Sequence, residues 1–224
     1  MNIALFYTDN RFIISTIYTL IVIVSCMIIY FKTSRLYRLT GHEGIKYFFM
    51  GFLFYALGFL AIYVTDWKVL LGENLIWNYL PIVMEYFLIM GGFYITYSLL
   101  WKKFLDNLFI SRIALLHIVA IMVAIIDFFF TRTYLMYIVE LTIGIYAAFI
   151  IYHNYIDNKE HKFTQFYLIS MICNILGWLM YFITWITQNS YPIIGLYTYI
   201  ITLAAFILLL YGVLRVEQKN GKKA

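Results

Sequence analysis

Charge is scarce in this sequence. Only 12% of its 224 residues are Asp, Glu, Lys or Arg, and 64% are hydrophobic. A typical soluble domain is about one-quarter charged and about half apolar. The composition therefore excludes an ordinary soluble domain and predicts a chain that lies largely within a membrane.

Proline and cysteine are also nearly absent, with two of each. So few prolines leave long apolar runs uninterrupted, which excludes a disordered chain. Cys26 and Cys173 both fall inside apolar runs, where no disulfide is expected, and neither has the spacing of a metal ligand. The cysteines therefore indicate neither a disulfide framework nor a metal centre.

What the sequence does contain is seven long apolar stretches. A helix needs roughly 20 mostly apolar residues to cross the hydrocarbon core of a bilayer. We expect membrane-spanning helices at 12–31, 45–66, 76–100, 111–130, 134–155, 163–186 and 193–215. The predicted fold class is therefore all-α, with residues 1–224 forming a single transmembrane domain.

The basic residues are distributed unevenly between the two sets of connecting segments. With the N-terminus outside, Arg11, Lys68 and Arg132 lie outside. The cytoplasmic segments then hold Lys32, Arg35, Arg38, Lys46, Lys102, Lys103, Arg112, Lys159, Lys162, Arg215, Lys219, Lys222 and Lys223. Lys and Arg favour the cytoplasmic side of membrane proteins. We therefore predict a multi-pass protein of the cell membrane, with its N-terminus outside and its C-terminus cytoplasmic, and we interpret the net charge of +5 as a topology signal with no nucleic-acid partner.

The two halves of the chain resemble each other. The second and sixth predicted helices align at a constant offset of 119, which pairs Leu57 with Leu176, Gly58 with Gly177, Leu60 with Leu179, Thr65 with Thr184, Phe48 with Tyr167 and Phe59 with Trp178. Apolar sequence also matches itself by chance, so coincidence is the alternative. A true repeat predicts three helices, a linker helix, and three more helices in the same orientation, related by an axis along the membrane normal.

This 3+1+3 plan resembles the architecture of the SWEET and PQ-loop transporters and, more distantly, that of microbial opsins and seven-helix receptors. Residues 32–58, with Leu36-Tyr37, the run 39–45 and Tyr47-Phe48, resemble uncharacterised archaeal seven-helix membrane proteins and, more loosely, sensor modules that precede histidine kinases. The resemblance implies a class of seven-helix membrane protein and no particular activity. A retinal opsin is excluded, because 193–215 has no lysine for a Schiff base.

Two carboxylates lie well inside the predicted spans, away from their ends. Glu85 lies near the middle of 76–100, and Glu140 lies about two turns into 134–155. A charged group at the centre of a spanning helix costs roughly 2.5 kcal/mol or more, so each is a candidate for function. We expect similar depths for the two, and one shared cavity if their helices are neighbours, which would suit proton coupling or binding of a cation. The alternative is a Glu that is only hydrogen-bonded inside the bundle.

Polar and aromatic residues form a second group of candidates. Asn174 shares a helix face with Trp178 and Tyr181, and Tyr137 shares one with Glu140. An amide among aromatic rings could bind a ligand, although an interhelical hydrogen bond is the simpler role. Tyr79, Tyr181, Tyr191 and Tyr197 are more typical of an aromatic belt at the membrane surface.

Pro81 predicts a helix kink one turn before Glu85. Asp127, at the outer end of 111–130, is expected to be solvated. The four histidines lack metal-ligand spacing; they are His42, His117, His153 and His161. The sequence also contains no motif of a soluble enzyme or of a cofactor site.

Three functions remain open, none of them enzymatic. The first is a receptor or sensor that binds a small molecule in the helix bundle and signals through a partner protein. The second is a small-solute carrier with Glu85 and Glu140 as coupling groups. The third is an assembly subunit of a membrane complex. In each case the lipid bilayer is the surrounding partner.

Overall fold

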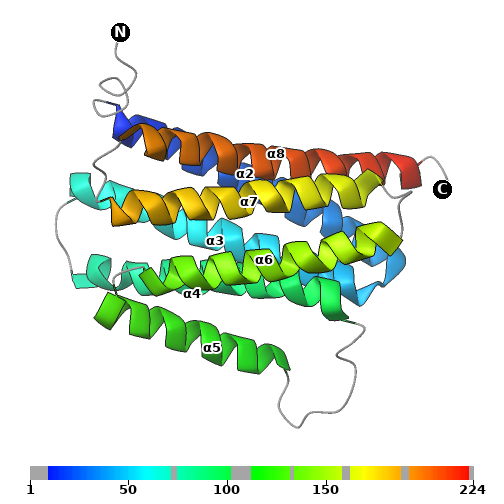
Figure 1. Ribbon diagram of the computed structural model, residues 1–224, viewed down its shortest axis with the longest axis horizontal. Helices are drawn as coiled ribbons and strands as arrows, with labels where there is room; N and C mark the ends of the chain where they lie inside the picture. The colour runs from blue at the N-terminus through cyan, green and yellow to red at the C-terminus, as the bar shows by residue number, and fades with distance from the viewer. Residues whose placement is uncertain are drawn as a thin grey trace.

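The computed structural model describes residues 10–71, 75–101, 112–131, 134–157, 162–187 and 192–221. Within them the chain is helical, and Figure 1 shows the helices lying side by side along one direction. Their bounds are α2 Arg11–Thr40, α3 Glu43–Leu71, α4 Leu75–Leu100, α5 Arg112–Ile126, the π-helix η2 Asp127–Thr131, α6 Tyr134–Asp157, α7 Lys162–Ile186 and α8 Pro192–Gly221.

The seven predicted stretches are confirmed as helices long and apolar enough to cross a membrane, with η2 continuing α5. Three helices run well beyond their predicted stretches, and one of them, α3, continues past residue 66 to Leu71. Helix α2 continues past residue 31 to Thr40, and α8 continues past residue 215. Gly41 ends α2 in the left-handed conformation, with φ 63°, and its N–H donates to the carbonyl oxygen of Tyr37 at 2.8 Å. A glycine in this conformation is a common helix stop, so part of the connection expected between the spans 12–31 and 45–66 is helical.

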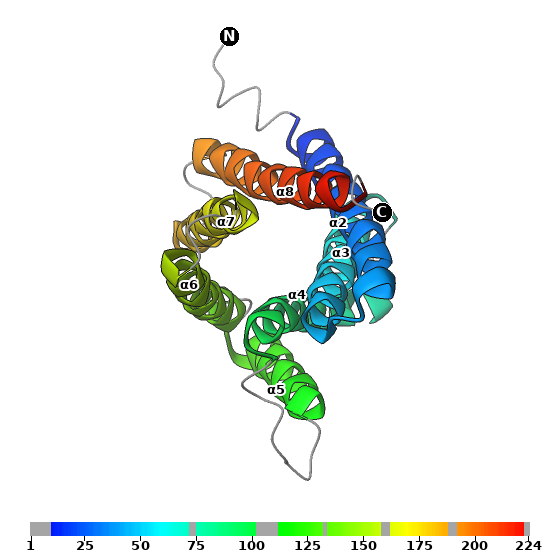
Figure 2. The same cartoon turned by 90° about the vertical axis from the view of Figure 1, so that its right-hand side faces the viewer.

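Six of the helices form a closed ring. Neighbours pack in the order α2, α3, α4, α6, α7 and α8, and α8 returns to α2. Figure 2, which views the bundle end on, shows this ring with α5 on its outside, next to α4. Helices α2–α4 and α6–α8 thus make up two arcs of three helices each. Whether the arcs are a true repeat, and which side of a membrane each end faces, remain predictions.

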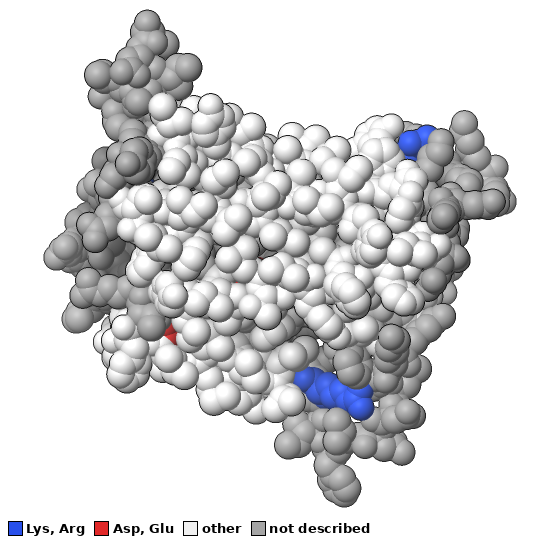
Figure 3. All heavy atoms as spheres, viewed as in Figure 1, with Lys and Arg blue, Asp and Glu red and all other residues white. Residues whose placement is uncertain are grey.

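The two ends of the bundle differ in charge. We call the end at which α2, α4, α6 and α8 begin the N-terminal end, and the opposite end the C-terminal end. Among the described side chains, Arg11 lies at the N-terminal end, whereas Lys32, Arg35, Arg38, Lys46, Arg112 and Arg215 lie at or near the C-terminal end. On the face drawn in Figure 3 the blue atoms lie toward one end and the middle is uncharged, as a surface in contact with lipid would be.

Helix α5 is attached to the ring by polar contacts that the sequence did not indicate. The Tyr86 hydroxyl and Nδ1 of His117 are 2.8 Å apart, and the Tyr94 hydroxyl and Nε2 of His117 are 3.3 Å apart. Both tyrosines belong to α4 and His117 belongs to α5. The imidazole therefore joins the outlying helix to the ring through both of its nitrogens.

The expectation for Asp127 was wrong. Its side chain is fully buried, with 0% exposure. The two carboxylate oxygens accept hydrogen bonds from the backbone N–H groups of Leu135 at 3.0 Å and Met136 at 2.7 Å. The first N–H groups of a helix have no partner within the helix. Asp127 supplies partners for two of them in α6, which explains how a carboxylate is held inside the bundle.

Candidate functional site

Four cavities follow one another through the middle of the ring. The first, at the C-terminal end, and the last, at the N-terminal end, are each lined by residues from all six ring helices. Each cavity shares lining residues with the next: Tyr167 joins the first to the second, Tyr55, Asn174 and Phe206 join the second to the third, and Phe59, Trp178 and Tyr181 join the third to the fourth. They therefore form one column along the ring axis.

The column is wide at its ends and narrow in the middle. The C-terminal cavity has a volume of about 380 Å³ and the N-terminal cavity about 180 Å³. The two between them measure about 30 Å³ and 10 Å³. A cavity needs roughly 10–15 Å³ to hold one water molecule. The ends can thus hold a small organic molecule, whereas the middle admits little more than water.

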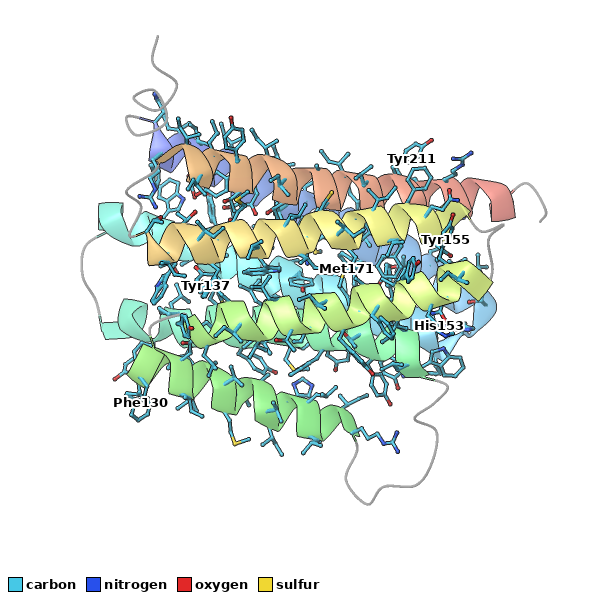
Figure 4. The ribbon with its side chains drawn as sticks, viewed as in Figure 1. Phe130, Tyr137, His153, Tyr155, Met171 and Tyr211 are labelled. Carbon is cyan, nitrogen blue, oxygen red and sulfur yellow. The ribbon has the colours of Figure 1, made fainter. Side chains whose placement is uncertain are left out.

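The N-terminal cavity brings together three of the predicted site residues. Tyr137 from α6 and Trp178 and Tyr181 from α7 line it, and their ring centroids lie 5.7–6.4 Å apart. Figure 4 shows Tyr137 toward one end of the bundle and Met171, which lines the second cavity, near its middle. Tyr137, Trp178 and Tyr181 together form an aromatic wall of this cavity.

Two further tyrosines complete this aromatic wall. The rings of Tyr18 on α2 and Tyr199 on α8 stack with centroids 4.4 Å apart, and the Tyr181 hydroxyl donates to the Tyr18 hydroxyl at 3.3 Å. The hydroxyl groups of Ser15 and Thr19 are the other polar groups of the lining. Thr19 donates to the backbone carbonyl oxygen of Ser15 at 2.8 Å. The cavity therefore offers ring faces and hydroxyls but no formal charge.

Asn174 lies next to this cavity on its C-terminal side, in the narrow middle of the column. It lines the second and third cavities, and within the described part of the chain its amide makes no hydrogen bond. The interhelical hydrogen bond considered for Asn174 is thus not formed in this arrangement. Its donor and acceptor atoms are left to whatever occupies the column.

Tyr55 faces the same narrow segment from α3 and connects it to Glu140. Its hydroxyl donates to Oε2 of Glu140 at 3.2 Å. Two adjacent glycines of α4 make room for this contact: a Cβ on Gly91 would lie 2.9 Å from the Tyr55 ring, and a Cβ on Gly92 would lie 3.4 Å from both Glu140 oxygens. Glu140 is 1% exposed, and its Oε1 has no hydrogen-bond partner among the described residues.

Glu85 lies apart from this group. It is 1% exposed on α4 and lies within electrostatic reach of Asp127, and its Oε2 lacks a described hydrogen-bond partner. The Glu140 carboxylate packs on Gly92, which is seven residues along α4 from Glu85, or about 10 Å along the helix. The two carboxylates therefore differ in depth, contrary to expectation, and neither lines the four cavities. Pro81 lies inside α4, one turn before Glu85.

The tyrosines assigned to an aromatic belt separate into two groups. Tyr79 and Tyr197 are more than half exposed on the bundle surface. Tyr181 instead lines the N-terminal cavity. Tyr191 lies outside the described residues. The exposed pair suits a membrane interface, whereas Tyr181 belongs to the interior.

The column is lined on opposite sides by matched positions of α3 and α7. We call residues 45, 48, 52, 55, 59 and 62 the α3 stripe and residues 164, 167, 171, 174, 178 and 181 the α7 stripe. Each α7 position follows its α3 counterpart by 119, and both members of every pair line the same cavity. The spacing of three and four residues places each stripe on one helix face. At the C-terminal end the pair Phe48 and Tyr167 touch, with ring centroids 5.6 Å apart.

The sequence did not single out Tyr18, Tyr55 or Tyr199 as site residues. A signal for Tyr55 was nonetheless present, because it is the counterpart of Asn174 at the offset of 119. No comparable signal marked Tyr18 or Tyr199, whose roles depend on the contact between the first and the last ring helices. The roles of Tyr18 and Tyr199 can be recognised only from the packing of the ring helices.

A larger cavity, of about 730 Å³, lies off the axis between α4, α5 and α6. Its lining includes Arg112 and the exposed Leu115 of α5, but none of the predicted site residues. In the described part of the chain, no three His, Cys, Asp or Glu side chains are grouped as a metal site would require.

No protein-family model, curated protein or solved structure matches this chain.

Proposed function

We propose that this multi-pass membrane protein binds a small molecule inside its helix bundle, in the aromatic N-terminal cavity, as a receptor or sensor would. The observation that supports the proposal is the meeting of Tyr137, Trp178 and Tyr181 around about 180 Å³ of space. Ligand pockets combine mostly apolar and aromatic walls with a few placed polar groups. The hydroxyls of Ser15, Thr19 and Tyr18 are such groups.

Native mass spectrometry of the detergent-purified full chain tests this proposal. We expect a stoichiometric small-molecule adduct on the protein ion, which is then released and identified. Trp178→Ala and Tyr181→Ala are expected to remove the adduct. Leu179→Ala is the matched control, because Leu179 neighbours Trp178 on α7 but is 39% exposed on the lipid-facing side.

The outcomes separate binding in the bundle from a role as an assembly subunit. Loss of the adduct in the cavity variants alone supports binding in the bundle. An adduct that survives both cavity variants, or lipid adducts alone, contradicts it. Lipid adducts together with a second retained protein would instead favour an assembly subunit.

A further inference from the structure

The shape of the column raises a question that a binding cavity alone does not answer. A receptor needs one cavity, reached from one end. This bundle has a wide cavity at each end, and the narrow segments between them lie on the same axis. The α3 and α7 stripes follow that axis over its whole described length, with six positions each.

We propose that the four cavities are segments of one pathway through the membrane, with the α3 and α7 stripes as its opposite walls, and that the pathway carries a small uncharged polar solute. The inference rests on the proposed function, because the N-terminal cavity is one of the two mouths. In this arrangement the arcs α2–α4 and α6–α8 are equivalent halves on either side of the path. Rocking of two such halves against each other is how many carriers expose a central site to each side in turn.

The pathway is closed at its centre in the present conformation. Cavities of about 30 Å³ and 10 Å³ admit roughly two water molecules and one water molecule, respectively. Tyr55 forms the obstruction together with Phe52 and Phe206, whose ring centroids both lie 6.4 Å from that of Tyr55. A solute passes only when these rings move, so the same three side chains act as the gate.

Glu140 holds this gate without lining the path. Its Oε2 accepts the hydrogen bond of the Tyr55 hydroxyl, and the Tyr55 ring rests against Gly91. Glu140 is therefore a positioning residue for Tyr55. Its carboxylate keeps the ring over α4 at the narrowest part of the column.

The lining chemistry indicates the class of solute. Among the described residues, the four cavities are lined by no Asp, Glu, Lys or Arg, and His42 lies at the C-terminal mouth. A charged solute would lose its hydration without gaining a counter-charge, which is costly inside a protein. The Asn174 amide and the hydroxyls of Ser170 and Thr202 can instead exchange hydrogen bonds with an uncharged polar molecule. Ser170 and Thr202 each donate to a backbone carbonyl oxygen at 2.8 Å and keep their own oxygens as acceptors.

Accessibility of single cysteines from the two sides of a membrane tests the pathway. In a Cys26→Ala, Cys173→Ala background, single cysteines replace Thr19 in the N-terminal cavity, Ser98 in the C-terminal cavity, and Asn174 or Ser170 in the middle. An uncharged, hydroxyl-bearing methanethiosulfonate reagent that crosses bilayers poorly is then added to right-side-out or inside-out vesicles. Ile172→Cys is the control, since Ile172 is on α7 but 47% exposed to the lipid side.

We expect Thr19→Cys and Ser98→Cys to react from opposite sides, and the middle cysteine to react from both. Because a thiol must be hydrated to ionise and react, the middle position should be modified roughly tenfold faster than Ile172→Cys. Adding Tyr55→Ala should raise the rate at the middle position from both sides. Ser170→Cys replaces Asn174→Cys if the latter does not fold.

A middle position that reacts from one side only, or from neither, overturns the pathway. That outcome leaves the proposed binding function standing if the native mass spectra still show the adduct. Conversely, reaction from both sides without any adduct supports the path and contradicts a stably bound ligand. The two experiments therefore fail independently.

Discussion

The hydroxyl of Tyr55 on α3 hydrogen-bonds to Glu140 on α6 across the surface of α4. The two residues are 85 positions apart in the sequence, and two glycines of the helix between them, Gly91 and Gly92, lie against them. A hydrogen bond thus connects the two arcs of the ring at the depth where the central column is narrowest.

A double-mutant cycle measures the strength of this contact. Tyr55→Phe and Glu140→Leu should each destabilise the bundle, and the double variant should lose less than the sum. The coupling free energy should be about 0.6–1 kcal/mol, as for hydrogen bonds inside membrane proteins. Reversible unfolding in mixed detergent micelles gives the three values. Glu140→Gln, which keeps an acceptor, should retain most of the coupling, whereas strictly additive losses would show that the hydrogen bond is not formed.

Gly91 should not tolerate a side chain while Tyr55 is present. An added Cβ would lie 2.9–3.1 Å from three atoms of the Tyr55 ring, closer than packed atoms normally approach. Overpacking of this kind typically costs about 1–3 kcal/mol. We expect Gly91→Ala to lower the free energy of unfolding by that amount in the native background and by much less in a Tyr55→Ala background. Equal losses in both backgrounds would mean that Gly91 matters for another reason.

Asp127 should behave as a helix cap. Asp127→Ala removes the acceptor of two backbone N–H groups of α6, and loss of a cap typically costs about 1 kcal/mol. Asp127→Asn retains one side-chain oxygen and should cost less. Thermal unfolding of the purified protein gives the order. Phe129→Leu is the control, because Phe129 is in η2 but 67% exposed.

His117 should govern how firmly α5 is attached. We expect His117→Leu to increase hydrogen–deuterium exchange in α5 more than Tyr86→Phe does, and Tyr86→Phe more than Tyr94→Phe. This order follows the two distances, 2.8 Å to Tyr86 and 3.3 Å to Tyr94. Exchange in α2, on the far side of the ring, should not change. Equal exchange in α5 in all three variants would show that apolar packing alone holds the helix.

The sequence predicted the spanning helices well because hydrophobicity and length are local properties. It also singled out Asn174, Trp178 and Tyr181, since a polar residue followed by aromatic residues at helical spacing stands out in an apolar helix. What it missed depends on which helices become neighbours. The position of α5 outside the ring, the different depths of Glu85 and Glu140, and the burial of Asp127 all follow from packing between distant segments.

The contact between α2 and α8 has a consequence for how the bundle is assembled during synthesis. Tyr18 on α2 stacks on Tyr199 of α8 and accepts its hydrogen bond from Tyr181 of α7. A growing chain inserts its helices in order, so Tyr18 enters the membrane long before either partner exists. Until then its hydroxyl lacks these contacts and the ring stays open on that side. The aromatic cavity is therefore completed last, when the α2–α8 contact closes over it.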